Sequence, residues 1–536
     1  MSLPNDPFAP LRAQAAQLGF RIVFPKDEDY DNKRQVVNQR FSYYPCAIAL
    51  CAKIEDVAAC VNFCRGHNIK IRIRSGGHQH EGMSAANEVL IIDLTLINTI
   101  RYAPDGQHAW IPAGKALHDV YLALEGKGKV IPGGVCDTVH VGGLVQGGGW
   151  GLLTRDKGFT CDNIVAAKMV LASGEIAEVS TEQHPDLFWA IRGGGGGNFG
   201  IITEYKFKLT DIGKQTVKYV ITYKTEDTRR AAINWAQKQC ELDYDPRLTV
   251  GGRIYVEKDH GSMLKVGGVY YGTLDETRSA IDYLLHDPKP VNVAYTIHYP
   301  QRINPQLFAT GHPTSHAAYP HSVTSAISSL ANILNPTATV NRSLGRLSPD
   351  DGCKGKHANK VSSAYALNDK SLMEGLMTKI VDYIESSCYD ETLTNYVSLH
   401  GTAGNAQHEP QGGSAVAFRE RPFMFKFQAW WDIFNDPDRD KERNAKYVKW
   451  VQDFRKHVAD DIDGAFINFQ DATLAAPLDP NTLEGRLALL RAYYADKLGR
   501  LRAVKEQYDP DYFFDFGMSI PPANCQYLKT KEAATK

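Results

Sequence analysis

Two nucleophilic side chains, each in a glycine-rich segment, are the residues of this chain best suited to chemistry. His78 lies in the segment RSGGHQ (residues 74–79), and Cys136 lies in PGGVCDTV (residues 132–139). Because glycine has no Cβ, the backbone there can approach a flat or phosphorylated ligand closely. Adjacent N–H groups at Gly76 and Gly77, after an expected strand, form an anion nest suited to a pyrophosphate. Taken alone, the same loop is equally well explained as an ordinary turn.

Two further glycine segments point to close approach of the backbone. One is GGGWG at residues 147–151, and the other is RGGGGGNFG at residues 192–200. Each glycine costs roughly 0.5–1 kcal/mol relative to alanine on folding. The run of glycines at 193–197 is therefore hard to explain as an ordinary loop.

The composition is that of a soluble globular protein. The chain has 536 residues, of which 43% are hydrophobic and 23% are charged, and its length suggests two or three domains. Lys and Arg total 60 against 61 Asp and Glu, so the charge does not favour nucleic acid or an acidic membrane as a partner. No run approaches the ~18 apolar residues that a membrane span needs.

The start of the chain, MSLPNDPF, lacks the basic beginning and the apolar core of a secretory signal. We therefore expect a cytoplasmic protein with reduced thiols. Ten cysteines in a chain of this length are no disulfide framework, and no zinc-type spacing occurs, so no metal is expected.

Hydrophobic patterning predicts an α+β first part that ends near residue 210. Strands at 69–74 and 89–93 flank the His78 loop, and a short strand at 129–132 leads into the Cys136 loop. The other expected elements are helices at 54–66, 116–125 and 185–191, a hairpin of strands at 164–172 and 176–179, and a strand at 201–209.

The middle of the chain, 213–470, favours a single antiparallel sheet with helices on one side. The expected strands are 217–223, 248–256, 264–272, 393–400 and 422–430, and the expected helices are 228–242, 275–285, 371–387 and 440–459. Residues 303–348 are interpreted as loops over a site, and a long helix is expected near 486–506.

In this order, the motifs resemble those of the berberine-bridge-enzyme-like branch of the FAD-linked oxidases, which have the vanillyl-alcohol-oxidase or PCMH-type fold. The matching segments are RSGGH at 74–78, Cys136 before Thr-Val and Gly-Gly, GGGWG at 147–151, RGGGGGNFGI at 192–201, and YDP with SIPP at 508–510 and 519–522. The resemblance extends from about residue 40 to residue 522.

The resemblance implies a domain plan and a cofactor. The fold class is α+β: a two-part FAD-binding domain at 1–212 (core about 40–211), a substrate-binding domain at 213–470 with an antiparallel sheet backed by helices, and a C-terminal segment at 471–536 that returns to the FAD domain. FAD would be held by an 8α bond to His78 and a 6-S bond to Cys136. The other implied FAD contacts are Arg74, Ser75, Gly76, Gly77, Gln79, Thr138, Val139, Val141, Gly142, Gly143, Gly148, Gly151, Ile201 and Asn468.

The resemblance also implies an oxidase reaction. A substrate C–H gives a hydride to flavin N5, and O2 then reoxidises the flavin and yields H2O2. Val139 matches the position at which oxidases of the family that admit O2 carry a small residue. The alternative is that Val139 is simply an aliphatic residue at a strand end.

Three residues depart from the family pattern near the expected reaction centre. Phe469, in NFQD at 468–471, replaces the tyrosine that serves as general base in sugar and alcohol oxidases, and a phenyl ring cannot accept a proton. Leu144 stands where the family has a histidine, and His140 replaces a glycine. His140 is either a substitute base or a hydrogen-bonded structural histidine.

Three tryptophans each allow two roles. Trp150 is either a substrate-facing platform or a packed aromatic residue. Trp430 and Trp431 are expected to pack between sheet and helices, and the alternative is that they reach the substrate groove.

Three functions remain open. Because an amine lone pair assists hydride loss without a strong base, Phe469 favours an oxidase of a specialised metabolite, with an amine or activated C–H ahead of an alcohol. An oligosaccharide or hexose oxidase would need another base, such as His140 or a tyrosine of the middle domain. A metabolite-binding flavoprotein with little turnover is the third. The expected partners are a small molecule and O2, with no nucleic acid or membrane, and the chain is expected to be a monomer or homodimer.

Overall fold

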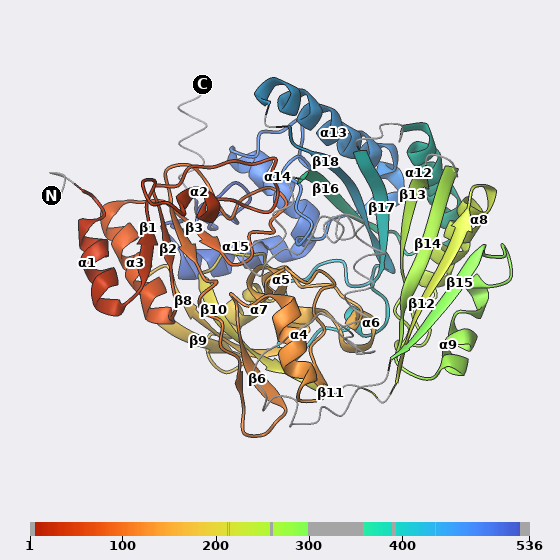
Figure 1. Cartoon of the computed structure of the whole chain (residues 1–536), viewed down its shortest axis with the longest axis horizontal. Coiled ribbons are helices and arrows are strands. Elements are labelled where there is room, and N and C mark those ends of the chain that lie inside the picture. The colour runs from red at the N-terminus through yellow and green to blue at the C-terminus, as the bar shows by residue number, and fades with distance from the viewer. Residues whose placement is uncertain are drawn as a thin grey trace.

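The computed structural model describes residues 6–211, 213, 215–257, 261–298, 357–387, 393–434 and 436–525. The segment 303–348, interpreted from sequence as loops over a site, lies outside these residues. In Figure 1 the elements of the first part of the chain lie on one side of the molecule, and a large sheet backed by helices lies on the other.

The first sheet positions the His78 loop. Its strand order is β1 (Arg21–Val23), β2 (Ala47–Leu50), β4 (Leu90–Asp93) and β3 (Ile71–Arg74), with β2 and β3 parallel to β4. Helices α1 (Ala9–Leu18) and α3 (Ile54–His67) pack together beside it, and α2 (Tyr30–Lys33) precedes β2. All residues of β2 and β4 are buried, as is typical of parallel strands covered on both faces. The predicted strands around His78 and the predicted helix at 54–66 are confirmed.

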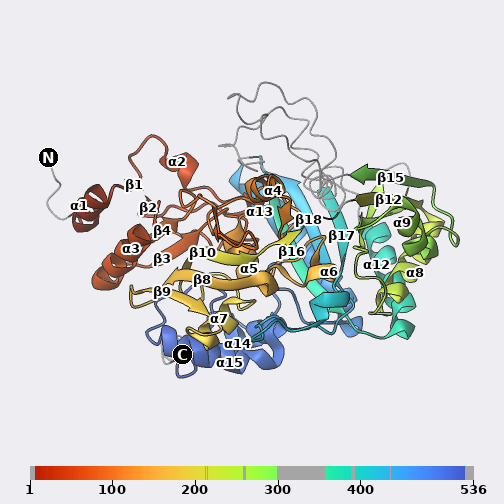
Figure 2. The ribbon, with the colours of Figure 1, turned by 90° about the horizontal axis from the view of Figure 1, so that it is seen from below.

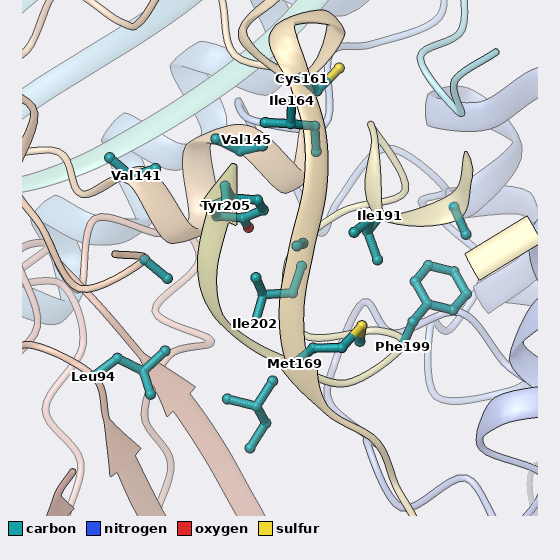
Figure 3. Close-up of a cluster of buried hydrophobic side chains, with 14 of the residues drawn as sticks. Leu94, Val141, Val145, Cys161, Ile164, Met169, Ile191, Phe199, Ile202 and Tyr205 are labelled. Atoms are coloured by element: carbon teal, nitrogen blue, oxygen red, sulfur yellow. The ribbon is translucent and has the colours of Figure 1, made fainter. Parts of the chain in front are cut away.

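The second sheet is antiparallel and carries the core of the first part. Its order is β5 (Arg101–Tyr102), β6 (His108–Pro112), β10 (Ile201–Lys208), β8 (Ile164–Val170) and β9 (Ile176–Ser180), and β7 (Lys129–Val130) pairs separately with β11 (Thr210–Asp211). Helix α5 (Val141–Gln146) packs against β6 and β10, and α7 (Pro185–Ile191) packs against β9. Helix α4 (Leu117–Glu125) contacts β7, and α6 (Thr154–Lys157) follows α5 in the chain. Figure 3 shows Ile202 and Tyr205 of β10 with Val141 and Val145 of α5 in one buried cluster. The predicted hairpin and the predicted helix at 185–191 are confirmed.

The third sheet confirms the predicted antiparallel sheet with helices on one side. Within the described residues its order is β15 (Asn292–His298), β12 (Thr216–Lys224), β14 (Gly261–Tyr270), β13 (Gly251–Glu257), β17 (Leu393–Gly401), β18 (Phe423–Asp432), β16 (His357–Ala366) and β19 (Ile462–Asp463). Helices α8 (Glu226–Gln239), α12 (Met373–Ser387) and α13 (Pro437–His457) cover one face, and α9 (Leu274–Ala280) lies near α8 (Figure 1). Strands β15 and β16 had not been predicted.

Alternation along the strands of this third sheet separates a helix-facing side from a side that faces the first part of the chain. Phe425, Phe427 and Trp431 of β18 belong to the core that the helices share with the sheet. The intervening Lys426 therefore points to the other face, because successive side chains of a strand alternate. Trp431 packs toward the helices as expected, whereas Trp430 lies on the opposite face and its indole N–H donates to Gln428.

The predicted single helix at 486–506 is wrong in one respect. The structure has two helices, α14 (Leu483–Tyr494) and α15 (Leu498–Tyr508), because Ala495 adopts a left-handed φ of 46° that ends the first. Figure 2 shows both helices near α7, and α15 packs against it. The C-terminal segment thus returns to the first part of the chain, where Ile520 N–H donates to Asn198 Oδ1 at 2.8 Å.

Candidate active site

The His78 and Cys136 loops meet. The His78 imidazole forms a hydrogen bond with the backbone of Thr138, two residues after Cys136. Burial, reinforced by the neighbouring His140, lowers the pKa of His78 to about 3. The ring is therefore neutral at neutral pH and keeps a lone pair for bond formation.

The backbone before His78 presents a row of N–H groups at the position where the sequence predicts an anion nest. In the described part of the chain, no acceptor meets the backbone N–H of Gly76, Gly77 or His78, and Gly77 has a φ of 68°. Gly77 is buried, and Gly76 and His78 are partly buried. Donors that lose water without gaining an acceptor are costly, so this row suits a ligand with acceptor oxygens. The Arg74 side chain, predicted to contact FAD, is bound within the protein. Its Nε donates to Asp93 at 2.7 Å, and this bond joins β3 to β4 below the loop.

Gln79 and Ser75 connect this loop to other parts of the candidate site. Gln79 Nε2 donates to Gln470 Oε1, and Gln79 Oε1 accepts the Met83 N–H at 2.8 Å. A Cβ on Gly142 would lie 3.1 Å from Ser75 Oγ, so the start of α5 lies against the loop.

The glycine run at 193–197 packs against α5. The Gln146 carbonyl accepts the N–H of Gly193 at 3.1 Å and that of Gly195 at 2.8 Å, and its side-chain Oε1 accepts that of Gly197 at 3.2 Å. A Cβ on Gly196 would come to 3.9 Å from the Gly143 Cα. The predicted segments around Gly143 and Gly196 are therefore brought together, with Val141 and Ile201 fully buried beneath them.

Asn468 fastens the third glycine segment. Its Oδ1 accepts the Gly149 N–H at 2.9 Å, and its Nδ2 donates to the carbonyls of Gly143 and Leu144 at 3.3 and 3.2 Å. Gly148 adopts a φ of 105°, which L side chains rarely adopt. A Cβ on Gly151 would meet the Gly133 carbonyl oxygen at 1.8 Å, which explains a glycine at that position beside the Cys136 loop.

The ring of Phe469 is surrounded by basic side chains. Lys426 Nζ lies 4.7 Å from its centroid, the His400 ring lies 5.6 Å away and the His80 ring 6.3 Å away. Burial lowers the pKa of Lys426 to about 8, an effect opposed by nearby Cys136. Within the described residues, Lys426 Nζ makes no hydrogen bond or ion pair. A buried amine of this kind is a candidate proton acceptor.

Lys426 and His400 are the site residues that sequence reasoning missed. The signal for Lys426 was available, since it is the one charged residue in the apolar strand FMFKFQAW. His400 is 5% exposed, and neither of its ring nitrogens has a hydrogen-bond partner in the described chain. Burial lowers the pKa of His400 to about 3, so it faces this region as a neutral imidazole.

Trp150 and His140 occupy the surroundings of the site. Trp150 is 5% exposed, donates from Nε1 to the Gly401 carbonyl at 2.8 Å and meets the His400 ring edge-on at 4.3 Å, which favours the packed-aromatic interpretation. His140 packs on Gly76, where a Cβ would lie 2.7 Å from its Cδ2, and it forms a hydrogen bond with the backbone of Gly114. Burial lowers its pKa. These contacts favour a structural role behind the His78 loop.

Val139 is partly buried against the core of the first part of the chain, and its carbonyl accepts the Leu117 N–H at 2.9 Å. Among the described residues no cluster of three His, Cys, Asp or Glu is arranged to hold a metal, and no helix is long and apolar enough to cross a membrane.

Comparison with known proteins agrees with this geometry. Residues 45–180 match the FAD binding domain, and residues 465–521 match the "Berberine and berberine like" family. The chain is therefore a FAD-dependent oxidoreductase whose C-terminal segment is similar to that of berberine bridge enzymes. It is 28% identical to the FAD-linked oxidoreductase YgaK of Bacillus subtilis over 95% of this chain and 98% of that one. It is 24% identical to a tetrahydroberberine oxidase of Berberis wilsoniae, over 86% and 82%.

Two solved structures share the fold of this oxidoreductase. A chitooligosaccharide oxidase has a TM-score of 0.76 at 20% identity, covering 96% of this chain and 99% of that one. A variant of berberine bridge enzyme has a TM-score of 0.76 at 21% identity with the same coverage. The unpaired N–H groups at 76–78 and the close-packed glycines around α5 fit the pyrophosphate and the flat ring system of FAD.

Proposed function

We propose that this oxidoreductase is a berberine-bridge-like, O2-dependent oxidase that holds FAD through covalent bonds to His78 and Cys136. The observation that supports it best is the contact between His78 and the backbone of Thr138. It places both nucleophile loops side by side, next to the unpaired N–H groups of the anion nest. When bound, FAD supplies a hydride acceptor for a substrate C–H and passes the electrons to O2 to form H2O2.

The protein side chains divide the remaining work. Gln146 and Asn468 hold the glycine segments that would accommodate the cofactor. Lys426, in its neutral form, accepts the proton of a substrate hydroxyl at Nζ. His400 offers an unused ring nitrogen to orient the substrate. The substrate is a specialised metabolite oxidised at an alcohol, an amine or an activated C–H.

A second candidate is an oligosaccharide or hexose oxidase. Phe469 argued against it from sequence, because the usual base is missing. Lys426 beside the Phe469 ring supplies another base, and a structural neighbour is a chitooligosaccharide oxidase. The third candidate, a metabolite-binding flavoprotein with little turnover, predicts tight binding without reduction of the flavin.

Denaturation tests the covalent attachment. Protein precipitated with acid should remain yellow, and His78→Ala or Cys136→Ala alone should still keep one bond. The double variant should release its flavin into the supernatant, while Cys46→Ala, a change at another free and partly buried cysteine, should behave as wild type. Release of free FAD from wild-type protein would show that the covalent proposal is wrong.

Anaerobic mixing tests the reaction. We expect bleaching of the flavin absorbance by members of a panel of alcohols, sugars including chitobiose, and amines including tetrahydroberberine. Admission of air should restore the absorbance and release H2O2 in equal amount. Binding that perturbs the spectrum without bleaching, across the whole panel, would favour the third candidate instead.

A further inference from the structure

Three cations form one row across the third sheet. Lys265 of β14 pairs in register with Arg253 of β13, Arg253 pairs with Ser398 of β17, and Ser398 pairs with Lys426 of β18. Directly paired residues lie on the same face of a sheet. Lys265, Arg253 and Lys426 therefore share one face.

That face is the one turned toward the candidate site. The strand neighbours of these cations, such as Leu264, Ile254 and Phe425, belong to the core on the helix side. Figure 1 shows β14, β13, β17 and β18 side by side, with α8 and α12 on the outer side and α5 and α6 on the inner side. Lys426 interacts electrostatically with Cys136, so one end of the row lies at the candidate site.

Arg253 is buried, and among the described residues it has no acidic partner. It is 7% exposed, and its Nε and Nη1 make no hydrogen bond in the described chain. Its guanidinium stacks on Tyr255, with 4.3 Å to the ring centroid, and also lies 5.4 Å from Tyr396. Stacking fixes its orientation but accepts none of its protons, and a desolvated guanidinium without an anion is costly.

Lys265 adds a second positive charge beside Arg253. Like charges directly opposite each other on neighbouring strands repel, and Lys265 faces Arg253 in register. Among the described residues neither side chain has an acidic partner. The acid on the same face of β13, Glu257, accepts a hydrogen bond from the Tyr255 hydroxyl instead. The positive charges of Arg253 and Lys265 are thus not balanced by acidic groups of the described chain. An anion from outside the chain that binds both side chains would balance them.

We propose that Arg253 and Lys265 form a binding site for an anionic oxygen group of the substrate, a carboxylate or a phosphate monoester. Arginine and lysine together are suited to such oxyanions. Neighbouring strands are about 4.8 Å apart, so Arg253 lies two strands, or about 10 Å, from Lys426. The substrate is therefore held by its anion at one end and oxidised at the other. The proposal rests on the oxidase function and narrows its substrate class.

Binding of inert probes to the flavin-loaded protein tests this site without turnover. Benzamide, benzoate and phenyl phosphate share a ring and differ in charge, and titration of the flavin absorbance yields a Kd for each. We expect wild-type protein to bind benzoate or phenyl phosphate at least about 10-fold more tightly than benzamide, which corresponds to 1.4 kcal/mol. Tighter binding of benzoate would indicate a carboxylate on the substrate, and tighter binding of phenyl phosphate would indicate a phosphate.

Substitutions test whether Arg253 and Lys265 cause the preference for anionic probes. The anion preference is the Kd of benzamide divided by the Kd of the tighter-binding anion. Arg253→Met and Lys265→Met should each lower this ratio to about one while leaving the Kd of benzamide unchanged. Lys449→Met, an exposed change in α13, should keep the wild-type preference. Should Arg253→Met fail to fold, Lys265→Met decides, because its side chain is less buried. Equal binding of benzamide and both anions by wild type, or a preference that survives at both positions, overturns the proposal.

The two proposals fail in different ways. If the flavin is covalently bound and reduced by substrates but the probes bind equally, only the anion site is wrong. If the protein releases its flavin, the oxidase proposal fails in its covalent part. The anion preference is then measured by the increase in Tm that benzoate or phenyl phosphate produces over benzamide.

Discussion

Lys426 is a buried amine that would have to lose its proton before it could act as a base. Its pKa of about 8 lies below its ordinary 10.5, because burial disfavours the ammonium form. The neutral form therefore grows as pH rises through 8. With an alcohol that bleaches the flavin, we expect the rate of anaerobic reduction to rise tenfold per pH unit below about pH 8 and to level off above it.

Substitutions separate a base from a mere positive charge at this position. Lys426→Met and Lys426→Arg should both slow reduction by an alcohol about 100-fold or more and abolish the dependence near pH 8, since arginine keeps the charge but does not give up its proton. Small primary amines added to Lys426→Ala should restore part of the rate. Activity of Lys426→Arg close to wild type would show that the charge, not proton transfer, matters.

At the scale of the elements, Asn468 holds α5 and the loop after it in place. Loss of its side chain leaves the Gly149 N–H and two α5 carbonyls without their partner, which should cost about 1–3 kcal/mol of unfolding free energy. We expect Asn468→Ala to lower the denaturation midpoint and the fraction of protein that carries flavin. Asn481→Ala, which removes a side chain from an exposed turn, is the matched control. Equal stability and flavin content in the two variants would contradict this role.

The elements also show what the sequence could and could not predict. Glycine motifs and strand patterns located the loops of His78 and Cys136, because those signals are local. The break at Ala495 was missed, since nothing in its residue type announces a left-handed φ. The cation row was missed as well. Lys265, Arg253 and Lys426 become neighbours only through the register of four strands, which a single sequence does not reveal.

At the scale of the whole molecule, a buried ion network joins the third sheet to the segment after His78 and to the segment after Phe469. Lys360 of β16 is fully buried, and its Nζ contacts Glu81 at 2.5 Å and Asp471 at 2.6 Å. Glu81 follows the His78 loop and also pairs with Arg40 at 2.8 Å, whereas Asp471 follows Phe469 and Gln470. Lys360 thus ties together the segments that carry His78 and the Phe469 ring.

Removal of this lysine should be strongly destabilising at neutral pH. Lys360→Met leaves Glu81 and Asp471 buried without their shared cation, which typically costs about 3–5 kcal/mol. Lys449→Met, which breaks an exposed pair with Asp453 at 2.5 Å, should change the free energy of unfolding by about 0.5 kcal/mol or less. Denaturant unfolding of both variants at pH 7 measures the difference.

Lowering the pH tests whether the charge of Lys360 accounts for the stability that this network contributes. Burial raises the pKa of Asp471, but the charge and hydrogen bond of Lys360 outweigh this and hold it below its ordinary 3.8. Wild type therefore loses this contribution as pH falls below about 4, where the unfolded chain takes up the proton first. In Lys360→Met the largest influence that opposes burial is removed, and only the hydrogen bonds of Ser362 and Thr473 still lower the pKa of Asp471. That pKa should therefore rise, and protonation should relieve the variant as pH falls. The gap in unfolding free energy should thus be largest near pH 7 and narrow below pH 5, whereas a constant gap would mean that Lys360 acts by packing alone.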